Sequence, residues 1–279
     1  MVPTWNAEAF IGPTLDSLRA QTYPNLEVLI SDDASTDSTA EICERYAAED
    51  GRFSVIRQPR NLGWIGNVNT LFERAEGTLV LMAFHDDLLA PRYIDECVAA
   101  LERNPGAVVA YSDITLIWQD GRKDEIRHAC IDRIDRASNR MRSIASHEGD
   151  WWVPLRGVIR ASAVRDIGGL KRHRAGEFSA DWPWLMNLAA AGTFVRVPEN
   201  LLTKVYRDKS LSRSWNHYSL RSLGGVTLDA LSVVISSDLA LRDKARLFLP
   251  TTKLVRERAP IRIAQLGRAA QRRFVSRAR

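Results

Sequence analysis

Two pairs of neighbouring aspartates each follow a run of apolar residues. Asp32 and Asp33 close an apolar segment that begins at Val28, and Asp86 and Asp87 close a second one. If each run is a strand of an open α/β sheet, the aspartates stand just beyond the strand ends, where such sheets bind their ligands. Four carboxylates in one place repel one another unless a cation or a hydrogen-bonding ligand separates them. The spacing therefore predicts an enzyme with a polar, metal-dependent site.

The segments around these pairs alternate between strand and helix. The residue pattern predicts helices over 7–20, 38–48 and 66–75, and strands over 27–30, 53–57 and 78–84. Strands that alternate with helices form βαβ units and a parallel sheet. The first hundred residues are therefore expected to form a parallel α/β sheet with both acidic pairs at its strand ends.

Composition places the chain among ordinary globular proteins. Its 279 residues are 45% hydrophobic and 26% charged, which suffices for a full core. No apolar run approaches the roughly 20 residues that cross a bilayer, and no basic-then-apolar leader opens the sequence. Cys43, Cys97 and Cys130 show no C-x-x-C spacing, which disfavours a disulfide framework or a zinc cluster. We expect a reducing, cytoplasmic setting.

The net charge of +5 is unevenly distributed. Residues 241–279 hold 12 Lys and Arg side chains against Asp243 and Glu257, which gives this segment +10 and leaves −5 for residues 1–240. Nucleic-acid-binding proteins usually carry a basic face beside their reading motif, so no nucleic-acid partner is expected for the body of the protein. A polyanionic surface that meets the basic segment remains open.

Short motifs follow one another in a fixed order along roughly residues 1–212. They are Pro3-Thr4-Trp5-Asn6, the segments 17–27 and 32–37, Asn61-Leu62-Gly63 with Asn69, Gly77, Asp86-Asp87 closed by Pro91, Ala180-Asp181-Trp182 with Gly192, and Tyr206-Arg207. Each motif alone is a weak signal, but their order and spacing resemble the family 2 glycosyltransferases of GT-A fold. The resemblance implies a GT-A-like α/β domain over residues 1–214. Its mostly parallel, nucleotide-binding sheet is flanked by helices, and residues 215–279 form a helical, basic C-terminal segment.

The resemblance implies a nucleoside-diphosphate sugar as donor, with Thr4, Trp5, Asp32 and Asp33 on its nucleotide. The two carboxylates follow a strand and precede a helix, so they can accept hydrogen bonds from a base N–H or from ribose hydroxyls. The ring of Trp5 can stack on a flat base. The alternatives are that an aspartate shapes a turn and that Trp5 belongs to the core.

Asp86 and Asp87 match the second half of the acidic motif that holds a divalent cation against the donor diphosphate in this family. Hard carboxylate oxygens suit Mg²⁺ or Mn²⁺, so both aspartates are predicted metal ligands. The chain departs from the motif at its first acidic position, which is Phe84 here. His85 stands between, as a lesser candidate ligand for Mn²⁺.

Asp181 occupies the position that carries the general base in the family, with Ala180 where a glutamate is usual. An aspartate at a helix start is otherwise an N-cap. Trp182 and Trp184, together with the tryptophans at 151 and 152, offer flat faces for sugars, although several of them must be core. Arg207 resembles a residue that neutralises the diphosphate leaving group, and the alternative is a solvated cation.

Two features concern the ends of the sequence. Apolar residues at Ile261, Ala264, Leu266 and Ala269 alternate with arginines, which suggests a basic amphipathic helix on an anionic membrane surface. A solvated or oligomer-contacting tail is the alternative. The family has an apolar first strand before the first motif, but only Met1-Val2 stand there in this sequence. Either that central strand is missing or the start of the sequence is assigned too late.

The resemblance thus predicts an inverting, metal-assisted glycosyltransferase that acts in the synthesis of bacterial-type surface polysaccharide or glycoconjugate. Its acceptor would be a glycan or a lipid-linked molecule. The enzyme would act in the cytoplasm or at the inner face of the membrane. The changes at Phe84 and Ala180 keep one alternative open, a non-catalytic relative that binds nucleotide or glycan. No motif in the sequence specifies the donor sugar, its base or the acceptor.

Overall fold

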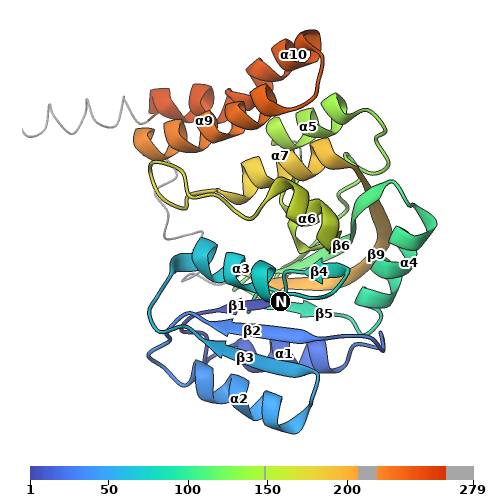
Figure 1. The fold of residues 1–279 in the computed structure, drawn as a ribbon, viewed down its shortest axis with the longest axis vertical. Helices are drawn as coiled ribbons and strands as arrows, with labels where there is room; N and C mark the ends of the chain where they lie inside the picture. The colour runs from blue at the N-terminus through green and yellow to red at the C-terminus, as the bar shows by residue number, and fades with distance from the viewer. Residues whose placement is uncertain (148, 207–218, 262–279) are drawn as a thin grey trace, which may run out of the picture.

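The computed structural model describes residues 1–147, 149–206 and 219–261 (Figure 1). Its strands are β1 (Val2–Thr4), β2 (Val28–Asp32), β3 (Phe53–Arg57), β4 (Leu79–Leu81), β5 (Asp87–Leu89), β6 (Ala107–Ile117), β7 (Lys123–Ile126), β8 (Val158–Arg160) and β9 (Thr193–Val205). Its helices are α1 (Ile11–Arg19), α2 (Thr39–Glu49), α3 (Gly63–Arg74), α4 (Tyr93–Arg103), α5 (Ala137–Ala145), the 3-10 turn η1 (Val153–Arg156), α6 (Ala161–Ile167), α7 (Asp181–Ala191), α9 (Leu220–Ser236) and α10 (Leu241–Thr251).

The first three strands form the predicted parallel sheet, in the order β1-β2-β3. All five residues of β2 are buried, as expected for a parallel strand that is covered on both faces. The three-residue strand β1 pairs with β2 so that Thr4 lies opposite Asp32. Both side chains therefore stand at the carboxyl end of this sheet.

The second sheet is mixed and runs in the order β4-β8-β6-β9-β5, with β7 added beside β6. Two backbone hydrogen bonds of 2.9 Å link it to the first sheet, from the Met1 amino group to the Leu81 carbonyl and from the Ala83 N–H to the Met1 carbonyl. The segment after β4 therefore lies beside β1. This neighbourhood carries the second acidic pair to the edge that holds the first.

The strand predicted over 78–84 is shorter in the structure. β4 ends at Leu81, and the chain turns before it enters β5 at Asp87. β5 runs antiparallel to the end of β9, and Asp87 pairs in register with Lys204. The second acidic pair therefore lies at the start of a short strand, facing a long one that arrives from more than a hundred residues later in the chain.

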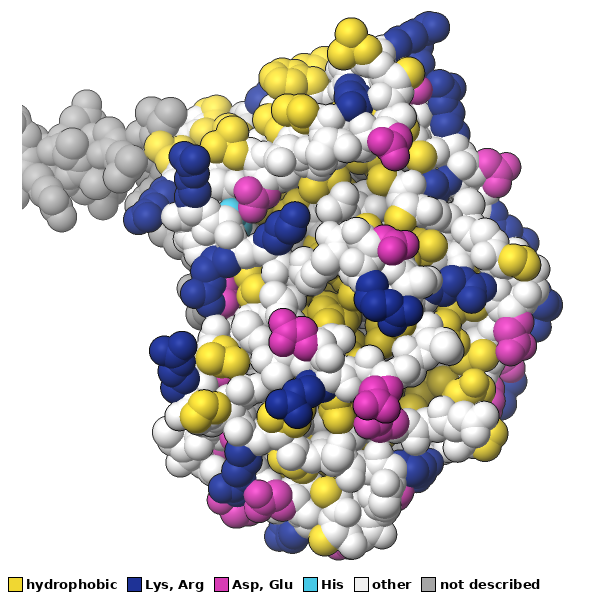
Figure 2. Space-filling model, viewed as in Figure 1, with side chains coloured by type: hydrophobic (Ala, Val, Ile, Leu, Met, Phe, Trp, Pro, Cys, Tyr) yellow, Lys and Arg dark blue, Asp and Glu magenta, His cyan; other side chains and the backbone are white. Residues whose placement is uncertain are grey.

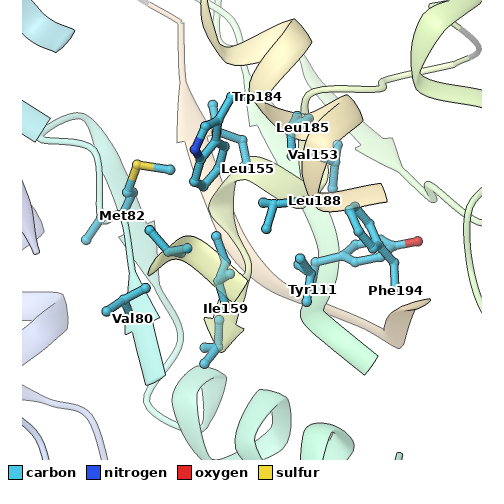
Figure 3. Packing of buried hydrophobic residues seen from close by; sticks show 14 of the residues in the cluster. Val80, Met82, Tyr111, Val153, Leu155, Ile159, Trp184, Leu185, Leu188 and Phe194 are labelled. Carbon is cyan, nitrogen blue, oxygen red and sulfur yellow. The ribbon is translucent and has the colours of Figure 1, made fainter. Parts of the chain in front are cut away.

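Helix α7 is anchored in the core by two of the tryptophans proposed as sugar platforms. Trp182 is fully buried and Trp184 is 4% exposed, and each indole N–H donates to a backbone carbonyl. Figure 3 shows Trp184 among Met82, Leu155 and Leu188. These two rings pack rather than face a ligand, and their packing fixes the helix that begins at Asp181.

The helices α9 and α10 pack on α5 and α7, on the side away from β1–β3 (Figure 1). Their buried residues join the main core, among them Leu223, Val226, Ala230 and Leu247. Among the described residues, none of the helices has both the length and the apolar character needed to cross a membrane.

Candidate active site

Thr4, Asp32 and Asp33 come together where β1 and β2 end. The Asp33 N–H donates to the Thr4 carbonyl over 2.9 Å, and all three residues are at most 2% exposed. The Thr4 Oγ1 and the Asp32 Oδ1 are buried, and neither has a hydrogen-bond partner within the described ranges. Buried polar atoms normally have a hydrogen-bond partner. These two oxygens therefore mark a place where a hydrogen-bond donor group of a ligand fits. Trp5 follows them and is 48% exposed.

The Asn61-Leu62-Gly63 motif holds Asp33 in place. The Leu62 N–H donates to the Asp33 Oδ1 over 2.7 Å, and the Asn61 side chain donates to the Asp33 carbonyl. Burial raises the pKa of Asp33, and the hydrogen bonds from the loop oppose that shift. Gly63 has a φ of +76°, and a Cβ there would lie 2.5 Å from a carboxylate oxygen of Glu177. The glycine is therefore required by the turn that brings the loop onto Asp33.

Asp86 and Asp87 lie in a cluster of four charged side chains. The Asp87 Oδ2 accepts a hydrogen bond of 2.6 Å from the Arg156 Nε. The Lys204 Nζ lies 3.5 Å from the Asp86 Oδ2 and 3.6 Å from the Asp87 Oδ1. Burial alone would raise the pKa of Asp86, but the neighbouring cations, Lys204 foremost, hold it below its usual value. The Asp86 carboxylate is therefore charged at neutral pH.

The turn that carries the acidic pair is fixed by Thr14 of α1. Its hydroxyl lies 3.0 Å from the carbonyls of both His85 and Asp87. The His85 ring packs 5.1 Å from the ring of Phe10. Burial lowers the pKa of His85, while the charge of Asp86 and the nearby backbone of Pro3 oppose that shift. This proximity ties the acidic turn to the end of β1 and thus to the first acidic pair.

Arg156 is a central residue of the site that no sequence motif indicated. Its guanidinium stands 4.7 Å from the centre of the Phe84 ring and 4.6 Å from that of Trp152, and its side chain is 9% exposed. Phe84, which replaces the family's first acidic residue, thus forms one face of a cation–π sandwich. The one sequence signal is that Arg156 ends an otherwise uncharged run from Trp151.

Asp181 opens α7 near the same cluster. Burial raises its pKa to about 6, although backbone N–H groups at the helix start and the charge of Arg156 pull the other way. Its Oδ1 is buried and lacks a hydrogen-bond partner in the part of the chain that the structure describes. A carboxylate with a pKa near neutrality and an unpaired oxygen is suited to proton transfer. The cap of α7 does not use this oxygen.

The acidic pair fits a divalent cation that is shared with a substrate. Within residues 1–147, 149–206 and 219–261, no group of three or more His, Cys, Asp or Glu side chains is arranged to hold a metal by itself. Mg²⁺ in phosphate-transferring sites is typically held by one or two carboxylates, with phosphate oxygens and water completing the shell. The Asp86 carboxylate and the Asp87 Oδ1 supply that number of hard oxygen ligands.

Arg207, the predicted partner of the leaving group, lies outside the described residues. Its near neighbour Lys204 is placed by the structure inside the site instead. The sequence signal for it is that Lys204 is the one charged residue between Leu201 and Tyr206.

The sequence matches the family model described as glycosyl transferase family 2 over residues 1–157. The uncharacterized protein y4gI of Sinorhizobium fredii is 32% identical over 182 residues, covering 61% of this chain and 18% of that protein. Putative glycosyltransferase EpsH of Bacillus subtilis is 33% identical over 138 residues, covering 44% of this chain and 40% of that protein. The chain therefore spans less than half the length of each of these relatives.

Solved structures share the fold at low sequence identity. The crystal structure of S. aureus TarS in complex with UDP-GlcNAc has a TM-score of 0.73 at 20% identity, covering 91% of this chain and 71% of that one. The mannosyltransferase PcManGT from Pyrobaculum calidifontis, in complex with GDP-Man and Mn²⁺, has a TM-score of 0.60 at 18% identity. The likeness covers 97% of this chain and 74% of that one. These likenesses confirm the predicted GT-A-type α/β fold. Because the family model spans more than half of the sequence, the chain belongs to glycosyl transferase family 2.

Proposed function

We propose that this protein is an inverting glycosyltransferase that moves a sugar from a nucleoside-diphosphate sugar to an acceptor hydroxyl. The observation that carries the proposal is a set of buried oxygens, on Thr4, Asp32 and Asp181, that have no hydrogen-bond partner among the described residues. The same part of the chain holds the charged cluster in which Asp87 pairs with Arg156 and Asp86 pairs with Lys204. A donor with a base, a ribose and a diphosphate supplies the hydrogen-bond donors and the negative charge that such a site lacks. Residues 1–214 are the proposed catalytic domain, and residues 215–279 the proposed helical, basic segment.

The nucleotide would lie across the ends of β1 and β2. Asp32 and Asp33 would accept hydrogen bonds from its base or ribose, and the exposed ring of Trp5 would stack on the base. The buried hydroxyl of Thr4 would donate a hydrogen bond to the nucleotide or accept one from it. Asp86, with Asp87, would hold Mg²⁺ or Mn²⁺ against the diphosphate, where the cation supplies neutralisation of the charge that develops on the leaving group.

Asp181 would act on the acceptor. Its carboxylate removes the proton from the attacking hydroxyl as the oxygen bonds to the anomeric carbon, and the bond from that carbon to the diphosphate breaks on the opposite face. One proton moves to Asp181, and the electron pair of the broken bond leaves with the diphosphate. Attack and departure on opposite faces invert the anomeric configuration. Arg156 and Lys204, the two cations beside the acidic pair, would stabilise the departing charge.

The direct test is the release of nucleoside diphosphate from a panel of donors, with and without Mn²⁺. UDP-GlcNAc and GDP-mannose head the panel, because solved structures of similar fold hold these donors. Metal-dependent release with one donor supports a transferase. Nucleotide binding without release from any donor would favour the alternative, a non-catalytic relative, which the changes at Phe84 and Ala180 motivate.

The acceptor is proposed to be a glycan or a lipid-linked molecule of surface polysaccharide or glycoconjugate synthesis, handled in the cytoplasm at the inner face of the membrane. The described helices of the C-terminal segment support the membrane contact. Leu228, Ile235, Leu241, Phe248 and Leu249 are each more than half exposed, and Figure 2 shows apolar side chains together with Lys and Arg over α9 and α10. Apolar side chains flanked by cations suit an anionic lipid surface.

The membrane contact predicts a charge-dependent affinity for lipid. Changing Arg242, Lys244 and Arg246 of α10 to glutamate in the full chain should weaken binding to anionic liposomes at least tenfold, because each Lys or Arg near such a surface contributes about 1 kcal/mol. Removing residues 241–279, which carry a net +10, should weaken it further. Liposome co-sedimentation at low salt measures both effects.

A matched control places the same three reversals on other elements than α10. Arg60, Arg74 and Lys123 are exposed on the catalytic domain, so their change to glutamate alters the net charge equally. Liposome binding that falls as much in this control reports net charge rather than a surface on α10. Absence of liposome binding by the unaltered chain at low salt would contradict the membrane contact.

A further inference from the structure

Lys204 stands between the two carboxylates that are proposed to hold the cation. Its strand register sets it opposite Asp87, and its ammonium lies 3.5 Å from an Asp86 oxygen and 3.6 Å from an Asp87 oxygen. The side chain is 14% exposed, so water screens these contacts weakly. The other oxygen of Asp87 is taken by Arg156. Each carboxylate therefore already has a positive partner.

The charges of this cluster balance before any ligand arrives. Asp86 and Asp87 contribute two negative charges, and Arg156 and Lys204 contribute two positive ones. A divalent cation that approaches Asp86 must enter beside the ammonium, and like charges at such distances repel strongly when they are poorly screened. A diphosphate that enters together with the cation brings about two negative charges, which restores the balance. The cluster thus favours binding of the divalent cation together with the diphosphate over binding of the cation alone.

We propose that Lys204 is a built-in counter-ion of Asp86 and Asp87 that keeps the divalent cation from binding until the nucleoside diphosphate is present. The inference rests on the proposed function, because it concerns the same acidic pair. It makes Lys204 a positioning residue that sets the order and coupling of binding. Metal and nucleotide should therefore bind with strong positive cooperativity.

The displaced ammonium has another partner nearby. The Lys204 Nζ lies 5.6 Å from the centre of the Tyr206 ring, a distance at which an aromatic face attracts a cation. That ring is itself stacked on Trp118, with centres 4.4 Å apart and planes within 3° of each other. The long, flexible side chain can therefore move from the carboxylates toward the ring or toward a phosphate oxygen while its charge remains compensated.

The test is a titration of the full chain with Mn²⁺ and no nucleotide, in which free Mn²⁺ is followed by electron paramagnetic resonance. Lys204→Met and Lys204→Gln are each expected to bind Mn²⁺ at least tenfold more tightly than the unaltered chain. Lys204→Arg keeps the charge and should bind as weakly as the unaltered chain. Lys123→Met removes an exposed lysine from β7 and should change nothing. The thermal melting of each variant is recorded to establish that it is folded.

A double variant tests whether the additional Mn²⁺ affinity of Lys204→Met arises at Asp86. Combining Lys204→Met with Asp86→Asn should abolish the gain in Mn²⁺ affinity, because the freed carboxylate is then missing. A repeat with UDP and with GDP should show less enhancement of Mn²⁺ binding by nucleotide in Lys204→Met than in the unaltered chain.

The outcomes separate this inference from the proposed function. Mn²⁺ affinity in folded Lys204→Met and Lys204→Gln that is no higher than in the unaltered chain overturns the inference, even if donors are turned over. So does an unaltered chain that already binds Mn²⁺ as tightly without nucleotide as with it. Conversely, a gain in Lys204→Met that Asp86→Asn removes supports the inference even if no donor is turned over, a result that would overturn only the proposed transfer.

Discussion

Changing Asp86 to asparagine is expected to abolish sugar transfer and to weaken nucleotide binding at least tenfold in Mn²⁺, with little change in EDTA. The asparagine keeps the shape of the side chain but loses the charge that would attract the cation. Because the cation is proposed to join Asp86 to the diphosphate, its loss should be felt only when metal is present. Calorimetric titration with the nucleoside diphosphate in the two buffers measures the difference, and a donor-hydrolysis assay measures the transfer.

Asp87 offers a matched comparison for that experiment. It is 1% exposed and is paired with Arg156 over 2.6 Å, so Asp87→Asn leaves a buried guanidinium without its counter-charge. Removal of one partner of a buried ion pair typically costs about 3–5 kcal/mol of stability, so this variant should melt well below the unaltered chain. Asp86→Asn should lower the melting temperature less, because Lys204 keeps its second carboxylate neighbour, Asp87, in that variant. Equal nucleotide affinity of Asp86→Asn and the unaltered chain in Mn²⁺ would show that Asp86 holds no cation.

The two acidic pairs could be predicted because their signals are local. An apolar run followed by aspartates predicts a strand that ends at a polar site, and the alternation with helices predicts a parallel sheet. The structure has those elements, with bounds shifted by a few residues, and it places Asp32 and Asp86 on neighbouring segments joined through β1 and β4. The family motifs added the order in which these pieces follow one another.

The cations of the site could not be predicted in the same way. Lys204 reaches Asp87 because β9 returns beside β5, and Arg156 reaches it across 69 residues of sequence. Such contacts depend on the strand order of the mixed sheet, which no local pattern specifies. The tryptophans of α7 present a different difficulty, because a visible local signal has two interpretations. A Trp beside Asp181 suits both a sugar platform and the core, and burial in the structure decides for the core.

The pH dependence of transfer should report Asp181. Its pKa is raised to about 6 by burial, and a general base must be deprotonated to accept the acceptor's proton. The value of kcat/KM is therefore expected to rise with pH through about 6 and then to level off. Asp181→Asn should remove this limb from the profile of the residual activity. An unchanged acidic limb in that variant would assign the titration to another group.

The folding stability of the chain should fall over the same pH range in which the activity rises. The pKa of Asp181 is higher in the folded chain, at about 6, than its ordinary value of 3.8, so the folded chain binds more protons than the unfolded chain between these pH values. The contribution of this carboxyl group to stability is therefore present at low pH and is lost as pH rises through about 6. At pH 7, Asp181→Asn should raise the free energy of unfolding by on the order of 1–3 kcal/mol, which denaturant titration can measure.

Asp181→Asn is finally expected to lower the rate of transfer by a factor of about 10² to 10⁴, the usual contribution of a general base. The residue lies at the start of α7, with an unpartnered buried oxygen among the described residues, and the proposed nucleotide contacts lie on other elements. The dissociation constant of the nucleotide should therefore stay within a few-fold of that of the unaltered chain. Single-turnover kinetics with a saturating donor separate the two quantities.

Two other carboxylates provide the controls for this assignment. Glu177 is engaged by Arg172 over 2.6 Å and accepts from the backbone of Trp64, and Asp150 lies in the loop before η1, where burial raises its pKa. Glu177→Gln and Asp150→Asn should each leave transfer within about tenfold of normal. If Asp181→Asn retains near-normal transfer while one of these two variants loses it, the base is that residue, and Asp181 serves the start of its helix alone.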